Sequence, residues 1–255
     1  MAQQPWRLMP TIVASGATHM ALDTLLLEQL IAGRQVPTLR FYRWHPTAVS
    51  LGYHQQDWPQ RWRSLRFHGQ AVDLVRRPSG GRAVIHQGDF TYAIALPMTG
   101  SRESAYRQIC DALIVAWQQF GVALGYGAAG RGYRHQANCF ALATAADLIT
   151  ASGYKLIGSA QLRRDRCLLQ HGSMRLWPDA DLSTQVFGAT PSPSAPPPAA
   201  IPPTVDEDWL AQLSATIVEE LARSLNVNFV TQPLSPEEQA QVAARASQFT
   251  IPAGP

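Results

Sequence analysis

The stretch RRPSGGRAVIH, residues 76–86, combines two arginines, a pair of glycines and an apolar run that ends in a histidine. It follows AVDLVRR, residues 71–77, which has the composition of a strand, so residues 78–82 are expected to form a loop between two strands. Because glycines carry no Cβ, the backbone there can approach a ligand closely and offer N–H groups to an oxyanion or a phosphate. The spacing fits neither a Walker loop nor a dinucleotide-binding fingerprint. From these residues alone, a ligand-binding loop and an ordinary hairpin with solvated arginines both stay open.

Outward from this loop, the chain has groups of strands separated by helices. Ser101 is placed as an N-cap with Glu103 in the first turn, and Ser152-Gly153 and Arg163–Asp165 are expected to be turns. The strands come mainly as hairpins, which predicts an α+β fold with a mixed, largely antiparallel sheet flanked by helices. Helices are predicted at residues 19–33, 101–121, 205–225 and 235–246, and strands at residues 38–44, 48–53, 71–77, 83–97 and, in succession, 139–176.

The length of 255 residues, with 46% hydrophobic, fits one large domain or two small ones. Residues 188–204 are rich in proline and are expected to be a surface connection without helix or strand. The remaining residues 205–255 are too few for a self-sufficient second domain. We therefore expect one domain over residues 1–255, with the C-terminal helices packed on the same domain.

The formal charge of +3 gives no reason to expect nucleic acid as a partner. Three widely spaced cysteines make neither a disulfide framework nor a zinc site, and they suit a reducing compartment. No signal peptide is evident, and no run approaches the roughly 18 apolar residues needed to cross a membrane. A cytoplasmic protein without a metal site is expected.

The segment YKLIGSAQ, residues 154–161, is predicted to be a strand in which Lys155, Ile157, Ser159 and Gln161 share one face. Small residues at 158–160 leave room for a ligand against the sheet. A lysine entering such a strand can bind a carbonyl or phosphate oxygen, or lower the pKa of a nearby thiol. The alternative is an edge-strand lysine that discourages aggregation.

The three cysteines differ in their surroundings. Cys110 lies on the apolar stripe of the predicted helix at 101–121, and Cys167 begins a strand without polar neighbours suited to catalysis. Cys139 follows the polar stretch YRHQAN, residues 133–138, where a thiolate can be stabilised. A nucleophile and a packed thiol both remain open for Cys139, because buried cysteine is common.

Five motifs occur in a fixed order and together resemble the biotin/lipoate protein ligase catalytic-domain family. This resemblance implies an α+β fold with an acyl pocket, and attachment of an octanoyl or lipoyl chain to a lysine of a carrier protein. The motifs are HMALD (residues 19–23), PTLRFYRWHPTAVSLGY (37–53), RRPSGGRAVIH (76–86), KLIGSAQ (155–161) and LLQHGS (168–173).

Within this family, the chain most resembles the cysteine-dependent octanoyltransferases, because Cys139-Phe140 shortly precedes the KLIGSAQ strand. The resemblance implies that Cys139 accepts octanoyl from octanoyl-acyl carrier protein as a thioester. It further implies that the chain is passed to a lysine of a lipoyl-domain protein such as the glycine cleavage H protein. Lys155 would lower the thiol pKa, and no cofactor would be needed.

Two alternatives remain. An ATP-dependent lipoate–protein ligase acting through a lipoyl-adenylate would use ATP and Mg, with Arg76, Arg77 and Lys155 holding the phosphate. A non-catalytic acyl-carrier-binding protein would keep the fold without the chemistry. The protein is expected to be a monomer that binds neither nucleic acid nor membrane. The predicted site consists of the catalytic Cys139 and Lys155 and the substrate-binding Arg76, Arg77, Gly80, Gly81, His86, Gly158, Ser159, Ala160 and His171.

Overall fold

The computed structural model describes residues 5–98, 100–127, 147–188 and 195–252. Its centre is an eight-stranded sheet in the order β13-β1-β2-β8-β12-β11-β10-β9, in which β1 is parallel to β2 and to β13 and the other pairs are antiparallel. The strands are β1 (Trp6–Ala14), β2 (Thr38–Trp44), β8 (Asp89–Pro97), β9 (Leu124–Tyr126), β10 (Asp147–Thr150), β11 (Lys155–Arg164), β12 (Cys167–Arg175) and β13 (Phe229–Thr231).

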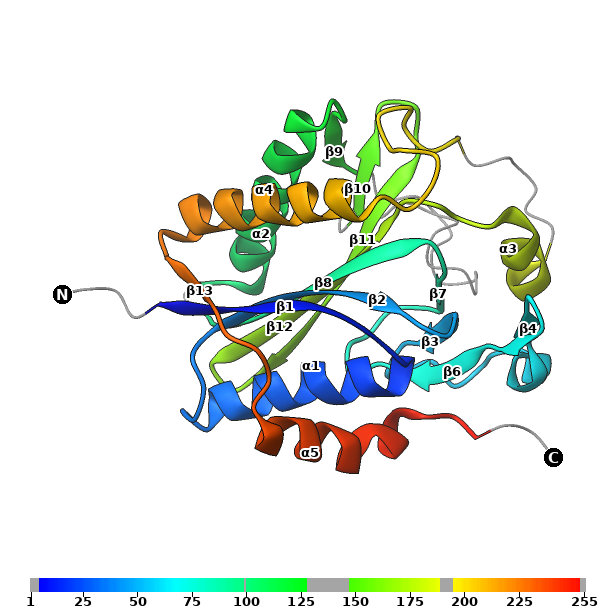
Figure 1. Ribbon diagram of the computed structural model, residues 1–255, viewed down its shortest axis with the longest axis horizontal. Helices are drawn as coiled ribbons and strands as arrows, with labels where there is room; N and C mark the ends of the chain where they lie inside the picture. Colours follow the sequence, from blue (N-terminus) through cyan, green and yellow to red (C-terminus); the bar gives the residue numbers. More distant parts are fainter. Residues whose placement is uncertain (1–4, 99, 128–146, 189–194, 253–255) are drawn as a thin grey trace.

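Helices cover both faces of this sheet. Figure 1 shows α2 and α4 on one side and α1 and α5 on the other, with α4 packed against α2 and α5 against α1. Among the described residues, no helix is long and apolar enough to cross a bilayer. The helices are α1 (Gly16–Ile31), α2 (Arg102–Gln119), α3 (Ala180–Phe187), α4 (Glu207–Leu225) and α5 (Pro236–Arg245).

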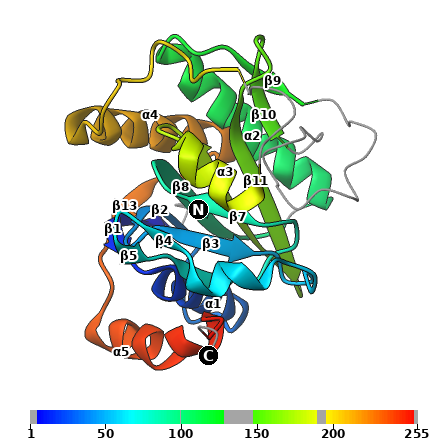
Figure 2. The ribbon, with the colours of Figure 1, turned by 90° about the vertical axis from the view of Figure 1, so that its right-hand side faces the viewer.

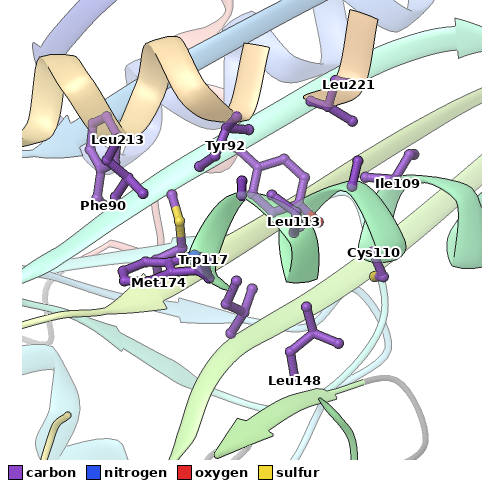
Figure 3. Close-up of a cluster of buried hydrophobic side chains, with 14 of the residues drawn as sticks. Phe90, Tyr92, Ile109, Cys110, Leu113, Trp117, Leu148, Met174, Leu213 and Leu221 are labelled. Carbon is purple, nitrogen blue, oxygen red and sulfur yellow. The ribbon is translucent and has the colours of Figure 1, made fainter. Parts of the chain in front are cut away.

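Successive side chains of β8 point to opposite faces of the sheet, so this strand packs against the helices on both sides. Large side chains of β8, such as Phe90 and Tyr92, face α2 and α4, whereas Ala93 and Ala95 face α1 and let that helix approach closely. The side chains that meet in the larger core are labelled in Figure 3: Phe90, Tyr92, Ile109, Cys110, Leu113, Trp117, Leu148, Met174, Leu213 and Leu221.

A second, three-stranded sheet brings the glycine loop to the α1 side of the molecule. In this sheet β3 (Ala48–Leu51) pairs in parallel with β6 (Asp73–Arg76) and antiparallel with β7 (Val84–His86). The loop at residues 77–83 therefore connects β6 to β7 across β3. Two strands of this sheet, β6 and β3, pack against α1, and Figure 2 shows β3 above that helix.

The predicted α+β class is confirmed, and so is the N-cap of α2, where the Ser101 hydroxyl accepts a hydrogen bond from the Ser104 N–H. β1 was not among the predicted strands because Pro10 interrupts its sequence and cannot donate to a sheet. The structure accommodates Pro10 with a shift in the β1–β2 register between Met9 and Ile12. α3 was also not predicted. Its N-cap is Asp179, just before a helix of only eight residues.

Candidate active site

A cavity of about 500 Å³ is bordered by the second sheet, by the start of α1, by β2, β8, β12 and β11, and by the start of α2 with β9 and β10. The larger core, between the sheet and α2 and α4, is the α2 core, and the core on the other face is the α1 core. His171 and Ser173 of β12 form part of the cavity wall, because they alternate with residues that face the α2 core. The predicted site residues that line this cavity are Arg77, Gly80, Gly81, His86, Lys155, Gly158, Ser159, Ala160 and His171. The structure thus brings together residues from three of the sequence motifs, at 76–86, 155–161 and 168–173.

The two glycines of the loop have different surroundings. Gly81 has a φ of +99°, a conformation that favours glycine, and its carbonyl oxygen lies so close to Gly52 that a Cβ on Gly52 would be 1.9 Å from it. A Cβ on Gly80 would meet no atom within 4 Å, so Gly80 borders open space. The loop backbone is therefore exposed to a ligand in the cavity.

The two arginines before this loop are bound to the protein itself. Arg77 is 6% exposed and donates to the carbonyls of Ser50, Gly80 and Arg82. Arg76 does not line the cavity, and its guanidinium donates to the carbonyls of residues 52, 53 and 55. Both arginines thus fix loop backbones, and the structure places Arg76 outside the site.

Lys155 reaches the cavity because of a β-bulge. The β10–β11 register shifts between Leu148 and Ile149, so the adjacent Leu156 and Ile157 both lie in the α2 core. The side chain of Lys155 therefore turns to the cavity wall, where its Nζ lies 2.8 Å from a carboxylate oxygen of Asp147. The expected alternation, with Lys155 and Ile157 on one face, is wrong for this reason. Lys155 is also the only lysine among the 255 residues.

His171 is held by a chain of hydrogen bonds that starts on α1. Its Nδ1 lies 2.8 Å from Oδ2 of Asp23, and its Nε2 is hydrogen-bonded to the hydroxyl of Ser79 in the glycine loop. Because a carboxylate only accepts, Nδ1 donates to Asp23, and Nε2 shares a hydrogen bond with the Ser79 hydroxyl. The second histidine is held in the same way, with His86 Nδ1 2.8 Å from Asp89 and Nε2 2.8 Å from the Ser50 hydroxyl.

The charges behind the cavity are fully buried. Asp23 forms an ion pair with Arg40, at 3.0 Å between Oδ1 and Nε, and both side chains are inaccessible to solvent. Burial alone would raise the pKa of Asp23, but the Arg40 guanidinium and the bond from His171 outweigh it and hold the pKa below its ordinary value. Burial lowers the pKa of His86, so its ring stays neutral near pH 7.

His19 adds a pH dependence to the stability. Burial and the neighbouring Arg40 lower the pKa of its ring from 6.5 to about 3. The unfolded chain binds this proton below about pH 6.5 while the folded chain does not, so stability falls as the pH falls. We expect the wild type to lose about 3 kcal/mol more than His19→Gln between pH 7 and about pH 4, at about 1.36 kcal/mol per unit of pKa. Urea unfolding of both proteins at each pH measures this, and parallel pH curves would contradict it.

Neither described cysteine is suited to nucleophilic attack. Cys110 is fully buried in the α2 core, and burial raises the pKa of its thiol to about 12. Burial also raises the pKa of Cys167, which begins β12 against the α1 core. Cys139, the predicted nucleophile, lies outside the described residues. Across the described ranges, no group of three or more His, Cys, Asp or Glu side chains is arranged to hold a metal ion.

Comparison with known proteins identifies the family of this chain. The sequence model of the lipoyl protein ligase A/B catalytic domain matches residues 15–209, which carry every described wall of the site. The chain belongs to this family. Among curated relatives, octanoyltransferase LipM of Moorella thermoacetica is 35% identical over 190 residues, which is 71% of this chain and 68% of the relative. LipM of Clostridioides difficile is 31% identical over 261 residues, covering 93% of each chain.

Solved structures of the lipoate ligase family share the fold. A lipoate-protein ligase A bound with ATP has a TM-score of 0.71 at 18% identity, covering 96% of this chain and 95% of its own. A structure from a study of a bi-partite lipoate protein ligase and its E2 lipoyl domain from Thermoplasma acidophilum has a TM-score of 0.70 at 19% identity, covering 96% of this chain and 93% of its own. At these identities the likeness concerns the fold.

Several residues of the site were not predicted from the sequence. Asp23, Ser50 and Asp147 bind predicted site residues, although each was read only as part of an element or a motif. The available signal was a polar residue within an apolar segment, such as Asp23 in MALDTLLL and Ser50 in AVSL. A buried polar group needs a hydrogen-bond partner, so such a residue indicates that a partner exists but does not identify it.

Proposed function

We propose that this chain is a protein N-octanoyltransferase of lipoate biosynthesis. It would take octanoyl from octanoyl-acyl carrier protein onto Cys139 and pass it to a lysine of a lipoyl-domain protein such as the glycine cleavage H protein. One observation favours a transferase over a ligase: the three cations that would hold an acyl-adenylate phosphate are each bound to other groups of the protein. Arg76 and Arg77 bind backbone carbonyls, and Lys155 is paired with Asp147. The names of the curated relatives support the same activity.

The cavity suits an acyl chain of this size. Its volume of about 500 Å³ lies within the range of small-molecule sites, roughly 300–1,000 Å³. Gly158 and Ala160 on the β11 wall leave space beside the sheet, while the half-buried Trp44 and Val84 supply apolar surface. At about 0.8 kcal/mol per buried methylene, the octanoyl tail contributes several kcal/mol of binding.

The proposed reaction has two steps that need no ATP or Mg. In the first, the Cys139 thiolate attacks the thioester carbonyl, and the carrier thiolate leaves and takes up a proton. In the second, the acceptor amine attacks the octanoyl-enzyme, the Cys139 sulfur leaves and the amine loses a proton. The first exchange is nearly balanced in energy, and formation of the amide makes the second downhill. The Gly80 and Gly81 amides and Lys155 would stabilise the oxyanion.

Lys155 is the residue proposed to activate the thiol. Its ammonium group, anchored by Asp147, would favour the thiolate form of Cys139. We expect Lys155→Ala to slow octanoyl-enzyme formation by roughly 10²-fold at pH 7, with partial recovery above pH 8.5 as the thiol ionises unaided. Single-turnover rates across the pH range measure this, with Lys155→Arg as the charge-preserving control. A pH-independent loss would contradict the role.

The experiment that tests the function omits ATP. Purified protein is mixed with octanoyl-acyl carrier protein and apo H protein, and the mass of the H protein is followed. A gain of one octanoyl group without ATP supports the transferase. Modification that requires free octanoate or lipoate together with ATP and Mg would instead establish a ligase. No modification under either condition would favour a non-catalytic acyl-carrier-binding protein.

A further inference from the structure

Two Asp–His–Ser chains of hydrogen bonds lead to the glycine loop. The first runs from Asp23 on α1 through His171 on β12 to the hydroxyl of Ser79. The second runs from Asp89 on β8 through His86 on β7 to Ser50 on β3. Ser50 continues it, because its carbonyl and hydroxyl accept from Nη1 of Arg77, at 2.9 and 3.2 Å.

These serines are poorly placed to be nucleophiles, although the order of groups is that of a hydrolase triad. Ser79 is 1% exposed and Ser50 is 0% exposed, so neither hydroxyl is open to a substrate carbonyl. The hydroxyl of Ser79 is bonded to His171 and does not line the cavity. Both chains instead lead to the loop backbone, the first through Ser79 itself and the second through Arg77.

The carbonyls of Ser79 and Gly80 are both directed toward other parts of the protein. The Ser79 carbonyl accepts from the Tyr53 N–H at 2.9 Å, and the Gly80 carbonyl accepts from Nε and Nη2 of Arg77 at 3.2 and 2.9 Å. In a trans peptide the C=O and the following N–H point in opposite directions. The N–H groups of Gly80 and Gly81 therefore point away from Tyr53 and Arg77.

These two amides are free to bind a ligand within the described structure. Neither the Gly80 nor the Gly81 N–H donates a hydrogen bond to any described residue, and both glycines line the cavity. Two successive N–H groups facing one space form a site for an oxyanion, and their value in catalysis depends on their being held in place beforehand.

We propose that Ser79, held by the Asp23–His171 pair, and Arg77, held by Ser50, are positioning residues that aim the Gly80 and Gly81 amides at the developing oxyanion. The inference rests on the proposed octanoyl transfer for its catalytic meaning. Its structural content is independent of that reaction: the bond from Ser79 to His171 sets the affinity of the loop for a tetrahedral anion.

The test removes one hydroxyl and compares two ligands with the same tail. Ser79→Ala breaks the bond to His171, Ser79→Thr retains a hydroxyl, and Ser214→Ala is the matched control on α4, where the serine bonds only to a helix carbonyl. Calorimetry measures binding of octylphosphonate, which is tetrahedral and anionic, and of octanamide, which is neutral. Single-turnover acylation by octanoyl-acyl carrier protein is measured on the same proteins.

We expect Ser79→Ala to weaken octylphosphonate binding about 10-fold while octanamide binding changes less than about 2-fold, since only a charged acceptor gains strongly from aligned donors. Acylation should slow by about 10- to 100-fold with KM for the donor unchanged, because one lost oxyanion donor costs about 10²- to 10³-fold. Ser79→Thr should restore both to within about 3-fold.

Equal losses for both ligands in Ser79→Ala would assign Ser79 a purely structural role and overturn the proposal, as would wild-type values for both. Thermal unfolding of each variant separates these outcomes from misfolding, and Ser79→Thr decides the matter if Ser79→Ala does not fold. If the wild type transfers no octanoyl group, the proposed function fails, whereas the ratio of the two binding constants still tests the positioning of the loop.

Discussion

Replacing Cys139 with alanine is expected to abolish octanoyl transfer, with a fall in rate of roughly 10⁴-fold or more, as is typical when a catalytic nucleophile is removed. The reason is chemical: the thioester intermediate needs a thiolate, and neither Cys110 nor Cys167 can supply one to the cavity. Intact-mass analysis after mixing with octanoyl-acyl carrier protein, without ATP, measures the octanoyl adduct directly. Hydroxylamine should remove the adduct from the wild type.

The other two cysteines provide matched controls. Cys110→Ala and Cys167→Ala should both form the hydroxylamine-sensitive adduct at rates near that of the wild type, because their thiols pack in the two cores. An adduct that persists in Cys139→Ala and disappears in either control would move the nucleophile to that residue. ATP-dependent lipoylation that survives in Cys139→Ala, with no adduct in any variant, would make the protein a ligase.

Asp23→Asn should lower the free energy of unfolding by about 3–5 kcal/mol at pH 7. The substitution keeps the shape of the side chain but leaves the Arg40 guanidinium buried without a counter-charge. Since the folded pKa of Asp23 is held below the unfolded value, the stability that it contributes is present above about pH 4 and is lost as the pH falls through the folded pKa. Denaturant unfolding should therefore show the two proteins converging in acid.

The control for this prediction is an isosteric change in an exposed pair. Glu103 lies 3.2 Å from Arg107 on α2, and the two side chains are 76% and 59% exposed. Glu103→Gln should cost no more than about 1 kcal/mol, because solvent screens such a pair. Similar losses in Asp23→Asn and Glu103→Gln would show that burial of the Asp23–Arg40 pair does not govern its contribution.

Local chemistry made much of this fold predictable. Serine caps, glycine turns and apolar periodicity locate helices and hairpins because they act over a few residues, and the Ser101 cap and the Gly153 turn lie where these rules put them. The glycine loop and the β11 and β12 residues of the cavity were likewise visible as motifs. Fold class follows from the order of such elements.

The rest depends on contacts between distant parts of the chain. Asp23 and His171 are 148 residues apart, so the chain that holds Ser79 has no local signature. The bulge that turns Lys155 toward the cavity depends on pairing with β10, and simple alternation along β11 gives the wrong face. β1 is a strand despite Pro10 because β2 and β13 supply partners on both sides.

The burial of Lys155 bears on whether an enzyme with the proposed activity would acylate itself. A protein that carries a reactive acyl thioester and delivers it to lysine amines is exposed to stray acylation of its own surface. Here the single ε-amine of the chain is 5% exposed and occupied by a carboxylate, and the remaining twenty basic side chains are arginines, whose guanidinium groups stay protonated and do not compete as acyl acceptors. In the proposed reaction, the surface of the described fold would therefore offer the thioester no lysine amine that competes with the amine of the acceptor protein.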